Sequence, residues 1–518
     1  MENKFKQSLL DKSVFSVTWE LVPGRGAKEK AQEVVFNSVE AAVKCGKIHG
    51  LTITDNPGGN PAISAEFLGA EIVRMGIEPL VHFTCKDKNR NMMEGLLHGL
   101  NRADVRNLLI MTGDYPVGGY GGRPKPVFDL DPVHALKLAR EMNAGLQVGT
   151  AAKPAQLKPT EFFSGCAASP FKRDEAEQVI QYYKLKKNIE AGADFIVPQL
   201  GYDMRKFHEL LQFIREQGWT TPIMGNIYIL PFGAGRAMSQ NFVPGCVVTK
   251  ELLAQLEKEK DAADKGKGAR LDRAAKMFAC FKGMGYDGVH IGGHGVPVGD
   301  VEYIIGKGEE LAPNWQDLVK ELEFPQPGGF YYYEKDEKTG LNTTIPTNRK
   351  SRPLDTTVPA VYESNRIIHK VLFNPGKGLF GAMLFMMKNV DGSGIEGFMM
   401  KFEHIIKHVL FDCENCGDCS LFELAYLCPM SQCPKKQRNG ACGGSFEGWC
   451  EVYPNKKKCI YVRAYARLKK HGEEETIRDT YVPPCNWDFY QTASWLNFYL
   501  GRDHVSKRLG LPTVPKPK

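Results

Sequence analysis

The sequence predicts an α/β protein in which a (β/α)8 TIM barrel is followed by a C-terminal cysteine-rich, metal-binding domain. Two features lead to this prediction. Between residue 14 and about residue 294, eight short apolar runs alternate with longer amphipathic, charge-rich stretches, and eight of the fourteen cysteines fall between residues 413 and 459. The expected domains are the barrel at 1–310, a connector with an apolar, Met-rich segment at 311–412, and the cysteine-rich domain at 413–518.

The apolar runs have the length of buried parallel strands, and eight of them in fewer than 300 residues is typical of a (β/α)8 barrel. Amphipathic stretches such as 173–191 and 202–216 predict the helices between them. In chain order, the predicted strands are 14–20, 49–54, 79–84, 107–112, 161–166, 195–199, 222–227 and 288–292.

Several predicted strands end in, or just before, polar or charged residues. Because the C-terminal ends of barrel strands meet at one rim, where the chemistry of this fold takes place, these residues predict an active site there. For the two histidines of the set a structural role and a catalytic role are equally open. The residues are Glu20, Thr54, Thr84, Asp114, Gln199, His290 and His294.

The cysteine-rich segment opens with a C-x-x-C-x-x-C run, which can supply three thiolates to one iron-sulfur cluster while a later cysteine supplies the fourth. Eight thiolates suffice for two [4Fe-4S] clusters, or for one cluster and one all-cysteine zinc site. Structural zinc throughout and a disulfide framework are the competing interpretations. The expected metal ligands are Cys413, Cys416, Cys419, Cys428, Cys433, Cys442, Cys450 and Cys459, with Cys485 as a candidate outside ligand.

The remaining sequence favours a cytoplasmic protein. The N-terminal residues include no apolar signal segment, and the Met-rich run at 379–387 is too short to span a membrane. A net charge of +7 is small for 518 residues and does not indicate a nucleic-acid-binding protein. Basic runs at 435–438, 456–458 and 467–470 lie in or beside the cysteine segment, where a solvated face or a surface for an acidic electron carrier is expected.

Several short motifs give residues 14 to about 294 a resemblance to the catalytic barrel of 5,10-methylenetetrahydrofolate reductase. The motifs are Trp19-Glu20-Leu-Val-Pro23, His82-Phe-Thr-Cys85, Met111-Thr-Gly-Asp114, Phe128-Asp-Leu-Asp131, Leu185-Lys-Lys-Asn-Ile-Glu-Ala-Gly-Ala193 with Gln199, and Ile229-Leu-Pro231. The chain departs from the family at Thr112, where the family has arginine, and at Asn188, where its second helix lysine is displaced to Lys187. The cysteine-rich end resembles the partner domain that accompanies this barrel in anaerobes.

The resemblance implies reduction of 5,10-methylenetetrahydrofolate to 5-methyltetrahydrofolate, or the reverse, by a bound flavin that is either FAD or FMN. Glu20 is the implied general acid, and we expect burial to raise its pKa toward neutrality. Gln199 is the implied pterin ligand. The implied flavin contacts are Thr54 and His82 at the ring or ribityl chain, Asp114 near N1, Phe128 as a neighbouring aromatic, and Lys187 at the phosphate.

The cysteine-rich end changes the expected electron source. One or two clusters would pass single electrons from ferredoxin or another iron-sulfur carrier to the flavin, in an oligomer or a redox complex. Two alternatives remain: a folate/corrinoid methyltransferase barrel without flavin, and a reductase that uses NAD(P)H with a structural zinc tail.

Overall fold

The computed structural model describes residues 2–150 and 152–515 of the chain, and the eight predicted runs all form strands of one sheet. Every pairing within the sheet is parallel. The strands are β1 (Ser16–Leu21), β2 (Gly50–Ile53), β3 (Pro79–Thr84), β4 (Asn107–Met111), β7 (Phe163–Ala168), β8 (Phe195–Pro198), β9 (Met224–Tyr228) and β10 (Gly288–Gly292).

The sheet curls into a nearly closed barrel. Its strand order is β8-β7-β4-β3-β2-β1-β10-β9, so β8 and β9 form the seam. The Ile196 amide donates a hydrogen bond of 2.9 Å to the Pro222 carbonyl, and Ile196 forms a parallel bridge with Ile223. These contacts across the seam confirm the barrel prediction.

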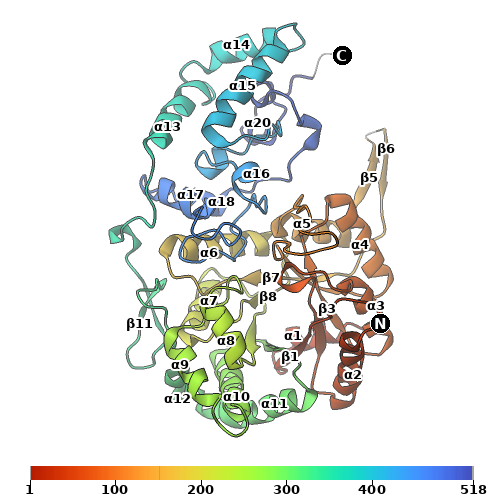
Figure 1. Ribbon diagram of the computed structural model, residues 1–518. Helices are drawn as coiled ribbons and strands as arrows, with labels where there is room; N and C mark the ends of the chain where they lie inside the picture. Colours follow the sequence, from red (N-terminus) through yellow and green to blue (C-terminus); the bar gives the residue numbers. More distant parts are fainter. Residues whose placement is uncertain (1, 151, 516–518) are drawn as a thin grey trace.

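Helices surround the barrel (Figure 1), and glycines with positive φ end several of them, as at Gly46 (67°) and Gly192 (116°). A β-hairpin of β5 (Gln147–Thr150) and β6 (Lys153–Gln156) projects between α5 and β7. The helices are α2 (Lys30–Cys45), α3 (Ala65–Arg74), α4 (Arg90–Arg102), α5 (Pro132–Asn143), α6 (Glu175–Ala191), α7 (Met204–Glu216), α8 (Phe232–Ser239), α9 (Lys250–Glu259), α10 (Lys267–Met284) and α11 (Val298–Leu311).

The barrel interior is apolar at one end and polar at the other. At the N-terminal ends of the strands, Phe5 and Leu9 of α1 (Lys4–Leu10) pack in one buried cluster with Leu80, Phe163 and Phe195. Toward the C-terminal ends, alternate residues of the strands are buried polar groups: Thr18, Thr52, His82 and His290. Helix α1 therefore closes the N-terminal end of the barrel, and the polar half at the C-terminal end remains open for a candidate active site.

The connector has more structure than the sequence indicated. It contains α12 (Trp315–Leu318), a hairpin of β11 (Tyr333–Lys335) and β12 (Asn342–Pro346), and the helices α13 (Ala360–Leu372), α14 (Phe380–Val390) and α15 (Glu396–Phe411). The Met-rich run lies in and beside α14. The cysteine-rich segment adds only short helices: α16 (Pro429–Gln432), α17 (Ile460–Lys469), α18 (Thr476–Asp479), α19 (Ser494–Tyr499) and α20 (His504–Arg508).

The C-terminal elements form a lobe that packs on α6 of the barrel (Figure 1). Val179 and Tyr183 of α6 share a buried apolar cluster with Tyr461 and Tyr465 of α17. Polar contacts add to this packing, since the buried Lys172 ammonium donates hydrogen bonds of 2.5 and 2.6 Å to the carbonyls of Gly443 and Ser445. The cysteine-rich segment therefore packs against the barrel through a buried interface and is not joined to it by a flexible linker alone.

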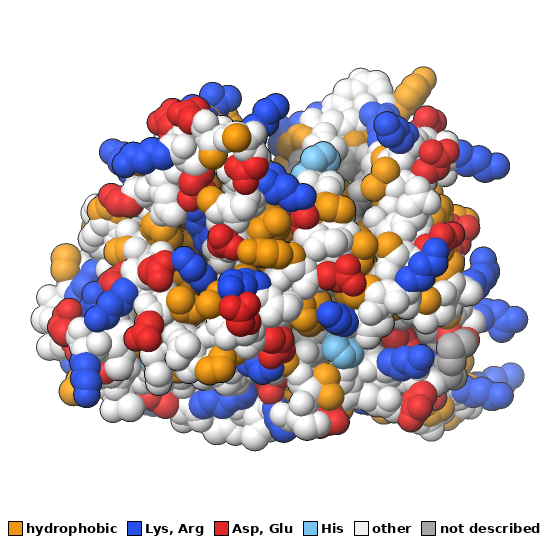
Figure 2. Space-filling model, turned by 90° about the horizontal axis from the view of Figure 1, so that it is seen from below, with side chains coloured by type: hydrophobic (Ala, Val, Ile, Leu, Met, Phe, Trp, Pro, Cys, Tyr) orange, Lys and Arg blue, Asp and Glu red, His pale blue; other side chains and the backbone are white. Residues whose placement is uncertain are grey.

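Only part of the three basic runs is exposed: Lys456 and Lys457 are exposed, whereas residues of the other two runs are taken up by contacts inside the protein. Lys435, Arg438 and Arg467 are buried, and Lys469 makes hydrogen bonds of 2.8 Å to both carboxylate oxygens of Glu175. Figure 2 shows the molecule from below, from the side opposite the C-terminal lobe, and there acidic and basic side chains are intermixed. Within the described residues, we find no helix with the length and apolar content needed to cross a bilayer.

Candidate active site

Glu20 lies at the C-terminal end of β1 and faces a histidine from the neighbouring strand β10. The Glu20 Oε2 and His290 Nε2 atoms are 3.5 Å apart. On the other side of the ring, His290 Nδ1 lies 3.0 Å from the Thr18 hydroxyl and 3.3 Å from that of Thr52. A threonine hydroxyl that donates to Nδ1 leaves the Nε2 proton directed at Glu20. The sequence left a structural and a catalytic role of His290 equally open, because its partner Glu20 is 270 residues away in the chain.

The expectation that burial raises the pKa of Glu20 toward neutrality is wrong. Burial does raise it, but the hydrogen bond and charge of His290 outweigh burial, so the pKa of Glu20 lies below its ordinary value. The Glu20 side chain is 18% exposed. A substrate that covers the carboxylate would remove this remaining solvent and push its pKa back upward.

Two buried polar atoms at the barrel mouth have no hydrogen-bond partner among the described residues. They are Thr54 Oγ1 and His82 Nε2, and both residues were predicted to contact the flavin. Burial lowers the pKa of His82 to about 4, so its imidazole is neutral at pH 7. Buried polar atoms are nearly always satisfied, so this unpaired donor or acceptor capacity fits a polar ligand in the mouth.

Asp114 and Phe128 lie on the loop that follows β4. The Gly58 amide donates a 2.7 Å hydrogen bond to Asp114 Oδ2, which ties this loop to the one after β2. Phe128 is buried and stacks on Tyr115 with ring centroids 6.2 Å apart. The structure thus orders both predicted residues on one side of the mouth.

Gln199 and Lys187 both make contacts inside the protein. The Gln199 Oε1 atom accepts a 2.9 Å hydrogen bond from the next backbone amide, at Leu200, which leaves its amide group as a donor. Lys187 is buried on α6, and burial lowers the pKa of its ammonium to about 8. One turn earlier, the Lys184 ammonium donates a 3.0 Å hydrogen bond to the Ala441 carbonyl of the C-terminal lobe.

The loop between Cys433 and Cys442 reaches the rim of the barrel beside Asp114. Lys435 donates a 2.7 Å hydrogen bond to the Gly113 carbonyl and forms an ion pair with Glu451. The Thr112 hydroxyl, at the position where the resembling family has arginine, donates a 3.1 Å hydrogen bond to Gln437. The C-terminal lobe therefore supplies a cation near the place where the family supplies its own.

The eight clustered cysteines divide into two sets, taken in order along the chain. The first set lines a cavity of about 20 Å3 and consists of Cys413, Cys416, Cys419 and Cys428. The second set lines a cavity of about 30 Å3 and consists of Cys433, Cys442, Cys450 and Cys459. All fourteen cysteines are free thiols, which argues against the disulfide framework.

The thiols suit a metal group chemically. Burial raises the pKa of Cys419 and of Cys433 to about 11, so each needs a nearby cation to become a thiolate at pH 7. In the described part of the chain no three His, Cys, Asp or Glu side chains converge closely enough to hold a metal ion. The iron-sulfur and zinc assignments therefore stay predictions.

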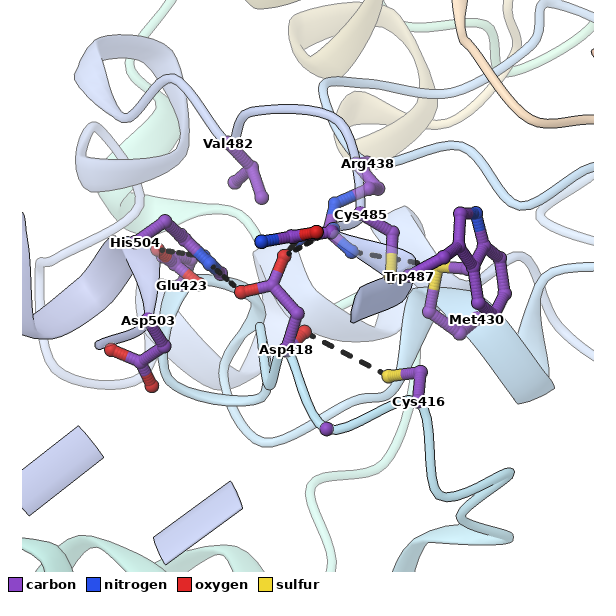
Figure 3. A network of polar contacts seen from close by, with 12 residues as sticks. Cys416, Asp418, Glu423, Met430, Arg438, Val482, Cys485, Trp487, Asp503 and His504 are labelled. Atoms are coloured by element: carbon purple, nitrogen blue, oxygen red, sulfur yellow. Dashed lines mark hydrogen bonds and ion pairs between the residues drawn. The ribbon is translucent and has the colours of Figure 1, made fainter. Parts of the chain in front are cut away.

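A network of buried charges supports the first set (Figure 3). His504 Nδ1 lies 2.6 Å from Asp418 Oδ1, and its Nε2 lies 3.0 Å from Glu423. Arg438, from the loop of the second set, approaches Asp418 at 3.5 Å. Cys485 packs in the same buried cluster as Cys416 but does not line the cavity of the first set, so its role as an outside ligand stays a prediction. The network thereby joins the loops of the two sets.

Comparison with known proteins agrees with this arrangement. The family described as "Methylenetetrahydrofolate reductase" matches residues 4–292, more than half of the chain. The chain belongs to the methylenetetrahydrofolate reductase family. A second family, "Methylene-tetrahydrofolate reductase C terminal", matches residues 393–488 and includes all eight clustered cysteines.

Curated members of this oxidoreductase family are distant relatives. "Methylenetetrahydrofolate reductase (NADH) 1" of Arabidopsis thaliana is 25% identical over 55% of this chain and 47% of its own length. "Methylenetetrahydrofolate reductase 1" of Schizosaccharomyces pombe is 23% identical over 37% of this chain and 30% of its own. The chain thus spans less than half the length of these relatives.

Among solved structures, a Clostridium thermocellum protein is described as binding two copies of 5-methyl-5,6,7,8-tetrahydrofolic acid. It aligns with a TM-score of 0.42 at 13% identity, over 60% of this chain and 99% of that protein.

Proposed function

We propose that this chain interconverts 5,10-methylenetetrahydrofolate and 5-methyltetrahydrofolate with a flavin in the barrel mouth, and that the two cysteine sets hold iron-sulfur clusters that connect the flavin to a one-electron carrier. The observation that carries the proposal is the position of the second cysteine set. Its loop docks on the barrel rim through Lys435 and Gln437, beside Asp114.

Support for a flavin comes from the unpaired Thr54 Oγ1 and His82 Nε2 at the mouth. When bound, a flavin supplies hydride chemistry that no side chain can perform. The hydroxyl and the neutral imidazole would hold its polar edge, and Asp114 would oppose negative charge on the reduced ring. The residues present do not distinguish FAD from FMN.

The folate half of the reaction needs a proton at the methylene-bearing nitrogen, and we assign its delivery to the Glu20 and His290 pair. In the free protein His290 keeps Glu20 ionised. Folate binding would cover the carboxylate and raise its pKa, so a proton could pass to Glu20 and then to the substrate. Thr18 and Thr52 would hold the His290 ring in place during this transfer.

Glu20→Gln tests the folate half. We expect flavin reduction to persist while methylenetetrahydrofolate turnover falls by about 100-fold to 10,000-fold, the usual range for loss of a general acid. Stopped-flow absorbance measures the two half-reactions separately. Unchanged turnover would reject the assignment of Glu20.

Metal analysis of anaerobically purified protein tests the electron path. Two [4Fe-4S] clusters require about eight irons and eight sulfides per chain. Cys416→Ser and Cys442→Ser should each perturb one cluster, as seen in the iron content and the low-temperature EPR spectrum. Cys280→Ser is the matched control, because Cys280 is a buried thiol outside both sets.

Two outcomes would change the proposal. About one zinc and four irons per chain would make one set a structural site. Absence of iron, with flavin reduced directly by NADH, would favour the second candidate, a reductase that takes hydride from a nicotinamide. The name of the Arabidopsis relative, which specifies NADH, favours that candidate.

A further inference from the structure

The C-terminal lobe contains a cavity of about 290 Å3, far larger than either cysteine cavity. Its walls come from α13, α14, α15 and α19 and from the loop after Cys419. Aromatic side chains make up much of the lining: Phe373, Phe411, Phe422, Tyr426, Trp495 and Phe498. An apolar cavity with few polar groups is a typical site for a small aromatic ligand.

This cavity and the first cysteine set share a wall. Lys407, Cys419 and Ser494 line both the 290 Å3 cavity and the smaller one. The Lys407 ammonium lies in this wall and donates hydrogen bonds to Cys419 Sγ at 3.4 Å, to Glu403 at 2.9 Å and to Ser494. A ligand in the cavity would therefore lie directly against a predicted cluster ligand.

Three polar side chains of the lining make no hydrogen bond to a described residue, namely Asn365, His369 and Tyr426, and His369 carries an aromatic ring nitrogen donor. Burial lowers the pKa of His369 to about 4, so the ring is neutral, and it stacks on Phe422 with centroids 4.0 Å apart. No described residue hydrogen-bonds either ring nitrogen, whereas the three donors of Lys407 are engaged. A neutral imidazole presents one N–H donor, which suits a carbonyl oxygen.

The volume limits the size of the ligand. An apolar cavity of about 150 Å3 accommodates benzene. A cavity of about 290 Å3 is therefore matched to two fused aromatic rings rather than to a flavin or a haem. We propose that the cavity binds a quinone of naphthoquinone size, with one carbonyl oxygen on His369 and the ring between the aromatic side chains, next to Cys419.

The choice of a redox ligand rests on the proposed function, because it requires that Cys419 belongs to an iron-sulfur cluster. The existence of the binding site does not depend on that function. The ring could reach the site free in solution or at the end of a lipid tail. The second source is compatible with α15, because Phe398, Phe402, Ile405 and Val409 form an exposed apolar stripe on a helix that also lines the cavity.

Quenching of tryptophan fluorescence tests binding without any activity assay, because Trp495 lines the cavity. The probe is 2,3-dimethyl-1,4-naphthoquinone, whose methyl groups prevent addition of thiols to the ring. We expect saturable quenching at micromolar concentrations, and Trp495→Phe should remove most of that signal. A tailed naphthoquinone in phosphatidylcholine vesicles, compared with quinone-free vesicles, tests the lipid source, and binding from either source supports the site.

Paired variants locate the site. Ile368→Phe with Ile406→Phe narrows the cavity and should weaken binding at least tenfold. Ile367→Phe with Ile405→Phe is the matched control, one residue away on the same helices, where both side chains are more than 60% exposed and lie outside the lining. The control should bind within twofold of the wild type.

Absence of saturable quenching, or equal affinities in the two double variants, would overturn the quinone site. That result would leave the proposed function intact if iron, flavin and folate turnover are present. Conversely, quinone binding to a protein that contains no iron would preserve the site and reject the electron path.

Discussion

Buried polar groups differ in hydrogen bonding between the barrel mouth and the charge network of Asp418, His504 and Arg438 beside Cys416. In the mouth, Thr54 Oγ1 and His82 Nε2 have no partner among the described residues. In the network, Asp418 pairs with both His504 and Arg438. Buried polar groups without a hydrogen-bond partner in a folded site indicate that a ligand binds there, whereas a network of paired groups indicates a rigid structural support. The difference is one of degree, because Arg438 Nε and Glu423 Oε2 of the network also lack a hydrogen-bond partner among the described residues.

The largest effect on the free energy of unfolding is expected in the charge network, where buried ion pairs lie close together. Asp418→Asn removes the counter-charge of Arg438 and one of the two carboxylates at His504, and loss of one partner of a buried pair typically destabilises by about 3–5 kcal/mol. Urea unfolding of the lobe measures this change. Asp479→Asn is the control, because Asp479 pairs with Arg478 at the surface and should change stability by less than about 1 kcal/mol. Equal losses of unfolding free energy in Asp418→Asn and Asp479→Asn would contradict the structural role of the buried network.

The two regions should also respond to pH in opposite directions. Folding depresses the pKa of His82 from 6.5 to about 4, so the unfolded chain binds more protons below pH 6.5 and stability falls as pH drops. Integrated from pH 7 to pH 5, this loss is about 2 kcal/mol. His82→Gln should flatten the acid limb of the unfolding free energy, and an acid limb as steep as that of the wild type would contradict this prediction.

His504 has the reverse sign. Burial lowers its pKa, but the carboxylates of Asp418 and Glu423 outweigh burial and raise it from 6.5 to about 9. Its contribution is therefore complete below pH 6.5 and is lost as pH rises through 9, by about 2 kcal/mol between pH 7 and pH 9. An alkaline limb that is unchanged in His504→Gln would refute this assignment.

The smallest effect, and the most diagnostic for the mouth, is expected for Thr54→Val. The replacement removes a hydroxyl that has no partner, so flavin-free protein should gain about 1 kcal/mol of stability, while flavin affinity should fall about tenfold. Calorimetric unfolding and flavin titration measure the two quantities. In the control Thr18→Val, the lost hydroxyl contacts His290, and the protein should be destabilised. Destabilisation by both variants would show that Thr54 is structural.

The strands were predictable from sequence, but the partners at the site were not. Buried parallel strands such as β3 are nearly continuous apolar runs, which a sequence displays directly. The pairing of Glu20 with His290 depends on barrel closure and has no local signal. The role of Lys435 at the rim likewise depends on how two domains meet.

One prediction failed because of packing. Lys435 and Arg438 were expected at the surface as part of a charge run, but they are buried against Glu451 and Asp418. The apolar segment at 379–387 has no helical periodicity in its sequence, because α14 is apolar on most of its faces. Its helical structure therefore appeared only in three dimensions.

The contacts that join the cysteine loop to the barrel have one further consequence. Lys184 and Lys172 of the barrel donate hydrogen bonds to the main-chain oxygens of Ala441, Gly443 and Ser445. In the opposite direction, Lys435 of the loop donates to the main-chain oxygen of Gly113. Main-chain oxygens are the same whatever the residue, so mutation of most loop side chains would leave the joint intact. The sequence of this loop could therefore drift at many positions while the lobe stays docked, provided that Lys435 and the apolar contacts of α6 with Tyr461 and Tyr465 are kept.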